Sequence, residues 1–204
     1  MIDPENITNY KQSYAELEEF ILFWVCAAGK NGRTAARCLD KFLKNIGYHE
    51  LPFDSPFDVI EDQAYDDLPN IMKDAGIGCF NQKARTFAEL IESGIDLKKC
   101  SVDDLEAIHG IGMKTARCFL IHSRRDVRLA GIDTHMLKHL KAVGVPNVPS
   151  STPSNKKEYV RLENEFLKLA DEAGKAPAVF DLEIWNKYSI KSEPKNVNNL
   201  DLTG

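Results

Sequence analysis

Apolar residues recur at intervals of three and four along most of this 204-residue chain, and this spacing predicts amphipathic helices. The first helix is expected to begin at a capping box, Ser13-Tyr14-Ala15-Glu16, in which the serine and glutamate side chains each accept a backbone N–H. Leu17, Phe20 and Trp24 then fall on one stripe of that helix. We find no alternating run of useful length and no internal repeat, so the sequence predicts an all-α fold.

The segment Gly110-Ile111-Gly112-Met113-Lys114 is predicted to form a tight turn between two short helices. Both glycines permit a positive φ and allow a partner to approach the backbone closely. Gly112 and Lys114 then lie at the N-terminus of the second helix, where unpaired N–H groups and the positive end of the helix dipole suit a phosphate. By itself, such a hairpin indicates non-specific DNA binding.

Charge is unevenly distributed along the chain. The 26 lysines and arginines and 31 aspartates and glutamates give a formal net charge of −5, which argues against a protein that coats DNA through its overall field. Between residues 113 and 141, however, cations outnumber acids by five; the cations are Lys114, Arg117, Arg124, Arg125, Arg128, Lys138 and Lys141. This basic segment predicts a limited phosphate footprint, although a solvated helix surface is the simpler interpretation of any single arginine.

The five cysteines are odd in number and widely spaced, at Cys26, Cys38, Cys79, Cys100 and Cys118. This pattern is typical of reduced thiols in a cytosolic protein. The chain contains no CxxC pair, so the sequence suggests neither a zinc site nor an iron–sulfur cluster.

A second segment, Gly131-Ile132-Asp133-Thr134-His135, follows the hairpin and places Asp133 where a helix N-cap belongs. The hairpin, Lys114 and this segment together resemble the helix-hairpin-helix DNA glycosylase superfamily. Because clustered cysteines are absent, the resemblance is nearest to the small, cluster-free 8-oxoguanine DNA glycosylase/AP lyases. It implies two helical lobes flanking a DNA-binding cleft that contains the helix-hairpin-helix motif.

The same resemblance implies the domain organisation. Residues 1–190 are expected to form a single glycosylase domain in two helical lobes, with a middle lobe at about residues 52–141 that carries the hairpin. The polar composition of residues 191–204 predicts a disordered tail.

In the family that the chain resembles, a lysine in the hairpin attacks a deoxyribose, and an aspartate that opens the next helix assists. Lys114 and Asp133 occupy these places, and a Schiff base on the lysine would permit strand cleavage by β-elimination. Attack requires a neutral amine, and burial and the helix N-terminus both lower the pKa of a lysine. A nearby Asp133 would oppose that shift, so we expect the two side chains to be separated or bridged at rest. The simpler alternatives are a lysine that contacts phosphate and an aspartate that only caps its helix.

The resemblance assigns contacts with DNA to five residues. The backbone amides of Gly110, Ile111 and Gly112 would hold the phosphate near the lesion. His135 matches a histidine near a DNA phosphate, and Asn81 belongs to a turn that lies beside the DNA. A structural hydrogen bond for His135 and a helix cap for Asn81 are the alternatives.

Three further residues are candidates for a base pocket. Cys118 lies one helical turn after Lys114 and shares its face, and in one 8-oxoguanine branch the matching cysteine packs against the flipped base. Trp24 and Trp185 could supply a stacking surface. For all three, burial in the core is the commoner role.

No cofactor, iron–sulfur cluster or side-chain metal site is expected, but main-chain carbonyls at Glu106, Ile108 and Ile111 match positions that bind a monovalent cation in this superfamily. The expected partner is double-stranded DNA with a damaged base, bound by a monomer. The N-terminus lacks the layout of a signal peptide, and no apolar run is long enough to span a membrane. We therefore expect a protein of the cytoplasm, at the nucleoid, or of the nucleus, and not a secreted one.

The resemblance makes 8-oxoguanine the expected lesion. Several small archaeal-type relatives end in a lysine that reads the lesion, whereas this chain continues past Lys187 and Lys191 to Gly204. A pyrimidine-lesion or modified-base glycosylase therefore stays open as an alternative. A non-catalytic DNA-bending or damage-sensing module is the non-enzymatic alternative, but it has no need for Lys114 and Asp133 together.

Overall fold

The computed structural model describes residues 1–47, 50–54, 56 and 67–189, and within these ranges every extended regular element is an α-helix. The all-α prediction is therefore confirmed. The helices are α1 (Tyr14–Ala27), α2 (Gly32–Asn45), α4 (Asp67–Asp74), α5 (Phe80–Glu92), α6 (Val102–Glu106), α7 (Met113–Ser123), α8 (Thr134–Ala142), α9 (Lys156–Glu172) and α10 (Pro177–Ser189). The tail expected at residues 191–204 lies outside the described residues.

Two serine caps fix the starts of α1 and α6. The Ser13 hydroxyl accepts the N–H of Glu16 at 3.3 Å, and the Glu16 carboxylate accepts the N–H of Ser13 at 2.7 Å. Ser101 and Asp104 make the same reciprocal pair at 3.2 and 2.7 Å. Each box satisfies two backbone donors that a helix N-terminus leaves unpaired, so the sequence sets these boundaries locally.

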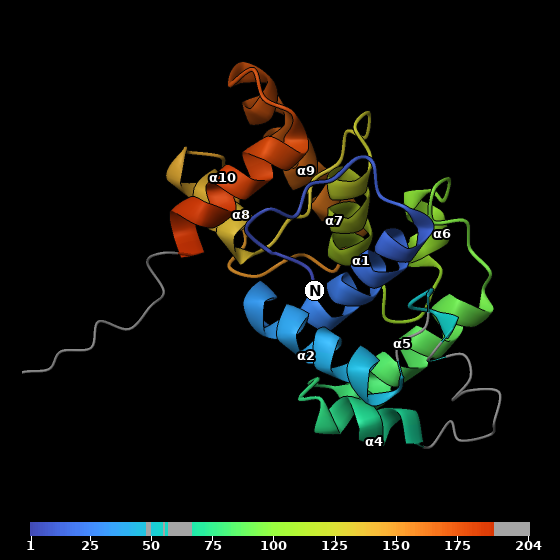
Figure 1. Cartoon of the computed structure of the whole chain (residues 1–204). Coiled ribbons are helices and arrows are strands. Elements are labelled where there is room, and N and C mark those ends of the chain that lie inside the picture. Colours follow the sequence, from blue (N-terminus) through green and yellow to red (C-terminus); the bar gives the residue numbers. More distant parts are fainter. Residues whose placement is uncertain (48–49, 55, 57–66, 190–204) are drawn as a thin grey trace, which may run out of the picture.

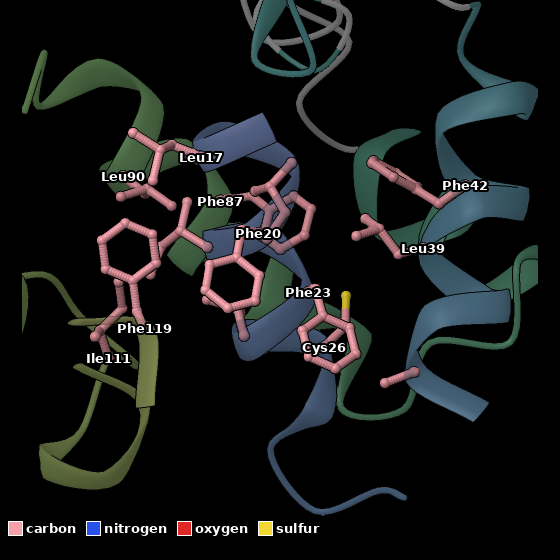
Figure 2. Packing of buried hydrophobic residues seen from close by; sticks show 14 of the residues in the cluster. Leu17, Phe20, Phe23, Cys26, Leu39, Phe42, Phe87, Leu90, Ile111 and Phe119 are labelled. Carbon is pink, nitrogen blue, oxygen red and sulfur yellow. The ribbon is translucent and has the colours of Figure 1, made fainter. Parts of the chain in front are cut away.

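The first of two hydrophobic clusters is built around α1. The ring centre of Phe20, on α1, lies 5.8 Å from that of Phe119 on α7. Phe42 of α2 packs edge-on against Phe87 of α5, with their ring centres 5.7 Å apart. Figure 2 shows Phe20 and Phe23 between Phe119 on one side and Phe42 on the other. This cluster holds α7, and therefore the second helix of the hairpin, firmly against α1.

The second cluster joins α8, α9 and α10 with residues 130–132, and its largest fully buried side chains are Tyr159 and Phe166. In Figure 1, α2, α4 and α5 lie at one end of the molecule and α8, α9 and α10 at the other, with α1 and α7 between them. Met113, at the start of α7, packs against the second cluster, although the helix itself belongs to the first. The N-terminus of α7 therefore lies where the two clusters meet. The lobe boundaries given above stay a prediction.

No helix in the described ranges is both long enough and apolar enough to cross a membrane.

Candidate active site

The hairpin between α6 and α7 uses its two glycines differently. Gly110 has a φ of 82°, and a Cβ there would lie 2.0 Å from the Thr86 hydroxyl oxygen, so both the turn and the packing require glycine. Gly112 has a φ of −87°, so it does not use the positive φ that glycine permits. A Cβ at Gly112 would meet nothing within 4 Å. No side chain caps α7 at this residue, which leaves the amides of its first turn open to an anion.

Asp133 connects the start of α8 to Lys114. Its Oδ1 accepts the backbone N–H groups of His135 and Met136 at 2.8 and 2.9 Å, as an N-cap does. Its Oδ2 lies 3.6 Å from Lys114 Nζ. The cap holds the carboxylate rigidly and leaves its second oxygen facing the amine.

The pKa of Lys114 is raised at rest, so the expectation of a lowered value was wrong. Burial by itself lowers the pKa of this amine, but Cys118, Asp133 and Asp181 raise it, and together they outweigh burial. Burial also raises the pKa of the Cys118 thiol, which is therefore neutral near pH 7. Asp133 Oδ2, 3.6 Å from Nζ, is the carboxylate oxygen paired with this amine.

A pocket of about 70 Å³, partly open to solvent, lies beside Lys114. The rings of Trp24 and Trp185 line it, together with His122 and Asp181. The structure thus brings both sequence-predicted tryptophans to Lys114, on helices that are distant in the sequence. The Trp24 Nε1 has no hydrogen-bond partner among the described residues and lies buried in the pocket wall.

His122 and Asp181 are site residues that sequence reasoning missed. The side chain of His122 is 1% exposed and its ring stacks on Trp24 at a centroid distance of 5.8 Å. Its Nδ1 lies 2.8 Å from the Thr8 hydroxyl, and its Nε2 lies 3.5 Å from Asp181 Oδ2, too far for a well-formed hydrogen bond. Burial raises the pKa of Asp181.

Helical spacing could have identified both residues. His122 follows Lys114 by two turns of α7 and therefore lies on the same face, and Asp181 precedes Trp185 by one turn of α10. Pro4 and Ile7 of the N-terminal segment complete this side of the pocket. The backbone N–H of Asn9 donates to the His122 carbonyl at 3.0 Å, which ties the segment to α7.

Cys118 takes a different place from the two tryptophans. It is buried, and a Cβ on Gly131 would lie 2.2 Å from its Sγ, so the thiol packs directly against the Gly131 backbone. It does not belong to the residues that line the pocket beside Lys114. In this structure its observed role is therefore packing against the segment that leads to Asp133.

The side chains of His135 and Asn81 make no hydrogen bond to another described residue. The ring of His135 meets Trp185 edge-on at 6.3 Å, and its buried Nδ1 has no partner among the described residues. Asn81 is exposed in the first turn of α5, whose N-cap is Cys79, so the alternative in which Asn81 caps the helix does not hold. Cys79 has a φ of 54° and makes no side-chain cap.

Much of the basic segment is engaged within the protein, contrary to the local charge count. Arg117 is buried and pairs with Glu106 and Glu163, and Arg124 donates to backbone carbonyls, including that of Leu97 at 2.9 Å. Arg128 pairs with Asp171 at 2.7 Å. Their partners come from distant segments, which a local count does not include. The exposed cations of the segment are Arg125, Arg128, Lys138 and Lys141, and of these Arg128 is paired with Asp171.

The described residues hold no cluster of three or more histidine, cysteine, aspartate or glutamate side chains suited to a metal ion. All five cysteines are free thiols. At the hairpin, the carbonyl of Ile108 accepts the N–H of Ile111 at 3.1 Å.

No family model matches the chain. Over 85 residues it is 35% identical to an 8-oxoguanine DNA glycosylase/AP lyase of Thermotoga sp. (strain RQ2), a match that covers 41% of this chain and 39% of that relative. The chain therefore matches about two fifths of the length of this curated relative.

Solved structures match over more of the chain. The 8-oxoguanine DNA glycosylase of Thermotoga maritima has a TM-score of 0.67 at 22% identity, covering 87% of this chain and 82% of its own. The Methanocaldococcus jannaschii 8-oxoguanine glycosylase/lyase, in complex with a 15mer DNA containing 8-oxoguanine, has a TM-score of 0.64 at 21% identity, covering 91% and 86%. The predicted likeness is confirmed: this chain has the helical fold of the 8-oxoguanine DNA glycosylases.

Proposed function

We propose that this protein is a DNA glycosylase with AP lyase activity, which excises a damaged base, 8-oxoguanine in the first instance, from double-stranded DNA. The observation that carries the proposal is the 3.6 Å approach of Lys114 to Asp133 at the open N-terminus of α7, beside an aromatic pocket. The names of the curated relative and of the solved structures support it. The protein acts as a monomer within the cell, at the nucleoid or in the nucleus.

The chemistry begins with deprotonation of Lys114. The neutral amine attacks C1′ of the deoxyribose as the bond from C1′ to the base breaks, and the base leaves with the bonding electrons and takes up a proton. The carboxylate of Asp133 stabilises the positive charge that develops on the sugar. Opening of the sugar ring gives a Schiff base between Lys114 and C1′. Loss of a C2′ proton then expels the 3′ phosphate by β-elimination.

The DNA is held through its backbone while the base is turned out of the stack. The open amides of Gly112 and of the first turn of α7 contact the phosphate near the lesion, with Gly110 beside them, whereas the N–H of Ile111 already donates to the carbonyl of Ile108. Main-chain carbonyls at Glu106, Ile108 and Ile111 are the proposed site for a monovalent cation at the same phosphate, and no other cofactor is needed.

The everted base enters the pocket beside Lys114, because C1′ cannot be reached inside a duplex. Trp24 and Trp185 offer ring faces or edges for it, and His122 and Asp181 offer polar groups. Cys118 lies behind this wall, and His135 supports Trp185 from behind. Asn81 is proposed to lie beside the duplex on α5.

The proposal is tested by borohydride trapping on duplexes that carry 8-oxoguanine, an oxidised pyrimidine, a modified base or an abasic site. Trapping and strand cleavage with 8-oxoguanine are expected. Trapping with a pyrimidine or modified base instead would retain the chemistry and change the substrate. A protein that binds all four duplexes without forming an adduct would be a DNA-bending or damage-sensing module.

A further inference from the structure

A buried polar contact joins α7 to the segment that leads to Asp133. Oε1 of Glu163, on α9, accepts Nε of Arg117 at 2.9 Å and the backbone N–H of Ala130 at 2.8 Å. The side chains of both ionic partners are at most 6% exposed, and Ala130 is fully buried. A single carboxylate oxygen therefore links the helix of Lys114 to the chain three residues before Asp133.

Tyr159, one turn before Glu163 on α9, makes two further hydrogen bonds to the same segment. Its hydroxyl accepts the N–H of Ile132 at 2.8 Å and donates to the carbonyl of Ala130 at 3.1 Å. The guanidinium of Arg117 lies 4.8 Å from the centre of its ring. Tyr159, Ala130 and Ile132 are all 0% exposed, so no solvent replaces these bonds.

We propose that Glu163 and Tyr159 are positioning residues that fix the separation of Lys114 and Asp133. The proposal rests on the proposed function. Helix α7 is held by the first hydrophobic cluster, whereas residues 130–132 form no helix. Side chains of α9 make three hydrogen bonds to their backbone, and the Thr152 hydroxyl makes a fourth, to the carbonyl of Ile132 at 3.3 Å. Arg117 also forms an ion pair with Glu106, the last residue of α6. We call the contacts of Glu163 and Tyr159 with Arg117 and residues 130–132 the clamp; it includes elements on both sides of the Lys114–Asp133 pair.

Such a clamp matters because misplacement of reacting groups by about 1 Å can cost about 100-fold in rate. Excision of an intact base needs both members of the pair, whereas a preformed abasic site needs mainly Lys114. Tyr159→Phe and Glu163→Gln are therefore expected to lower single-turnover excision about tenfold or more, and to lower trapping on an abasic site much less. Glu172→Gln, at an exposed position of the same helix, is the matched control.

A second measurement does not depend on activity. The titratable groups around Lys114 are Cys118 and His122 on its own helix, Asp133, Asp181 on α10 and Lys30 across the pocket. Loosening residues 130–132 moves Asp133 away, so the pKa of Lys114 falls in both clamp variants. The ¹³Cε signal of Lys114, assigned by its loss in Lys114→Gln, reports this titration. Phe42→Leu, which destabilises the distant first cluster, is expected to leave it unchanged.

The outcomes separate the two proposals. Wild-type protein that traps no substrate, while Tyr159→Phe still lowers the pKa of Lys114, refutes the function but supports the clamp. If the wild-type protein is active and both clamp variants equal Glu172→Gln in excision rate and in the titration of Lys114, the clamp proposal is refuted. If Tyr159→Phe unfolds, Glu163→Gln decides, because it is close to isosteric and removes the negative charge that pairs with Arg117.

Discussion

Asp133 divides its work between its two oxygens. Oδ1 receives two backbone N–H groups of α8, and Oδ2 faces Lys114. Asparagine keeps a side-chain oxygen and caps helices about as well as aspartate. Substitution at this residue can therefore separate the structural role of the carboxylate from its electrostatic one.

Asp133→Asn is expected to lower the excision rate on an 8-oxoguanine duplex by about 100-fold or more, because the negative charge beside the developing sugar cation is lost. The melting temperature should change little, and trapping on a preformed abasic site should persist. Lys114→Gln should fail on both substrates while still binding DNA. A borohydride-trapped adduct with Lys114→Gln would show that the nucleophile lies elsewhere.

The pairing of Cys118 with Gly131 predicts a compensating substitution. Gly131→Ala drives a methyl group to 2.2 Å from the Cys118 sulfur, and overpacking of this kind costs about 1–3 kcal/mol. Cys118→Ala removes the sulfur, and the next contacts of the new methyl group lie at 3.7 and 3.8 Å. Thermal denaturation of the two single variants and the double variant should give a strongly favourable coupling energy. Additive losses would contradict this packing.

At the scale of the elements, the hairpin is a pair of glycines with separate duties. Gly110 closes the turn against Thr86 of α5, and Gly112 leaves the start of α7 uncovered. Gly110 therefore contributes to the stability of the fold, and Gly112 to the access of an anion to the start of α7.

Gly110→Ala is expected to lose stability, by about 1 kcal/mol or more, because it combines a positive φ with a clash against Thr86. Gly112→Ala should lose less than about 1 kcal/mol, the order of an N-cap effect, yet weaken duplex binding by covering the phosphate site. Chemical denaturation and a fluorescence binding titration measure the two effects. Equal DNA affinity for Gly112→Ala and wild type would count against backbone recognition at this turn.

Sequence reasoning succeeded for elements whose signals are local. The capping box at Ser13 and the cap at Asp133 need only neighbouring residues, and both predictions are confirmed. Pairing across the fold was not predictable in this way. Arg117 was counted as a surface cation, although its partner Glu163 follows 46 residues later in the chain.

The pocket was only partly predictable for the same reason. Helical spacing groups Asp181 with Trp185 on α10 and His122 with Lys114 on α7, but nothing local brings these two groups together with Trp24. The start of α10 beside α7 brings these residues to one place. The raised pKa of Lys114 likewise depends on the closeness of Asp181, which the sequence alone does not reveal.

For the whole molecule, a net charge of −5 opposes DNA, and binding must come from a small positive area. Apart from Arg128, which pairs with Asp171, the exposed cations of the basic segment are Arg125, Lys138 and Lys141. If each neutralises one phosphate, the logarithm of the binding constant should fall against the logarithm of salt concentration with a slope of about −3. Titration of a labelled duplex between low and moderate salt measures this slope, and Lys138→Gln should make it shallower by about one. A slope near zero would contradict a phosphate-anchored site.

The N-terminal segment has a practical consequence for any laboratory that prepares this protein. The amino group of Met1 lies 3.5 Å from Glu19, and the Thr8 hydroxyl lies within hydrogen-bond distance of His122. Pro4 and Ile7 line the pocket beside Lys114. An affinity tag fused directly to Met1, or removal of the N-terminal residues, would therefore alter the cavity beside Lys114.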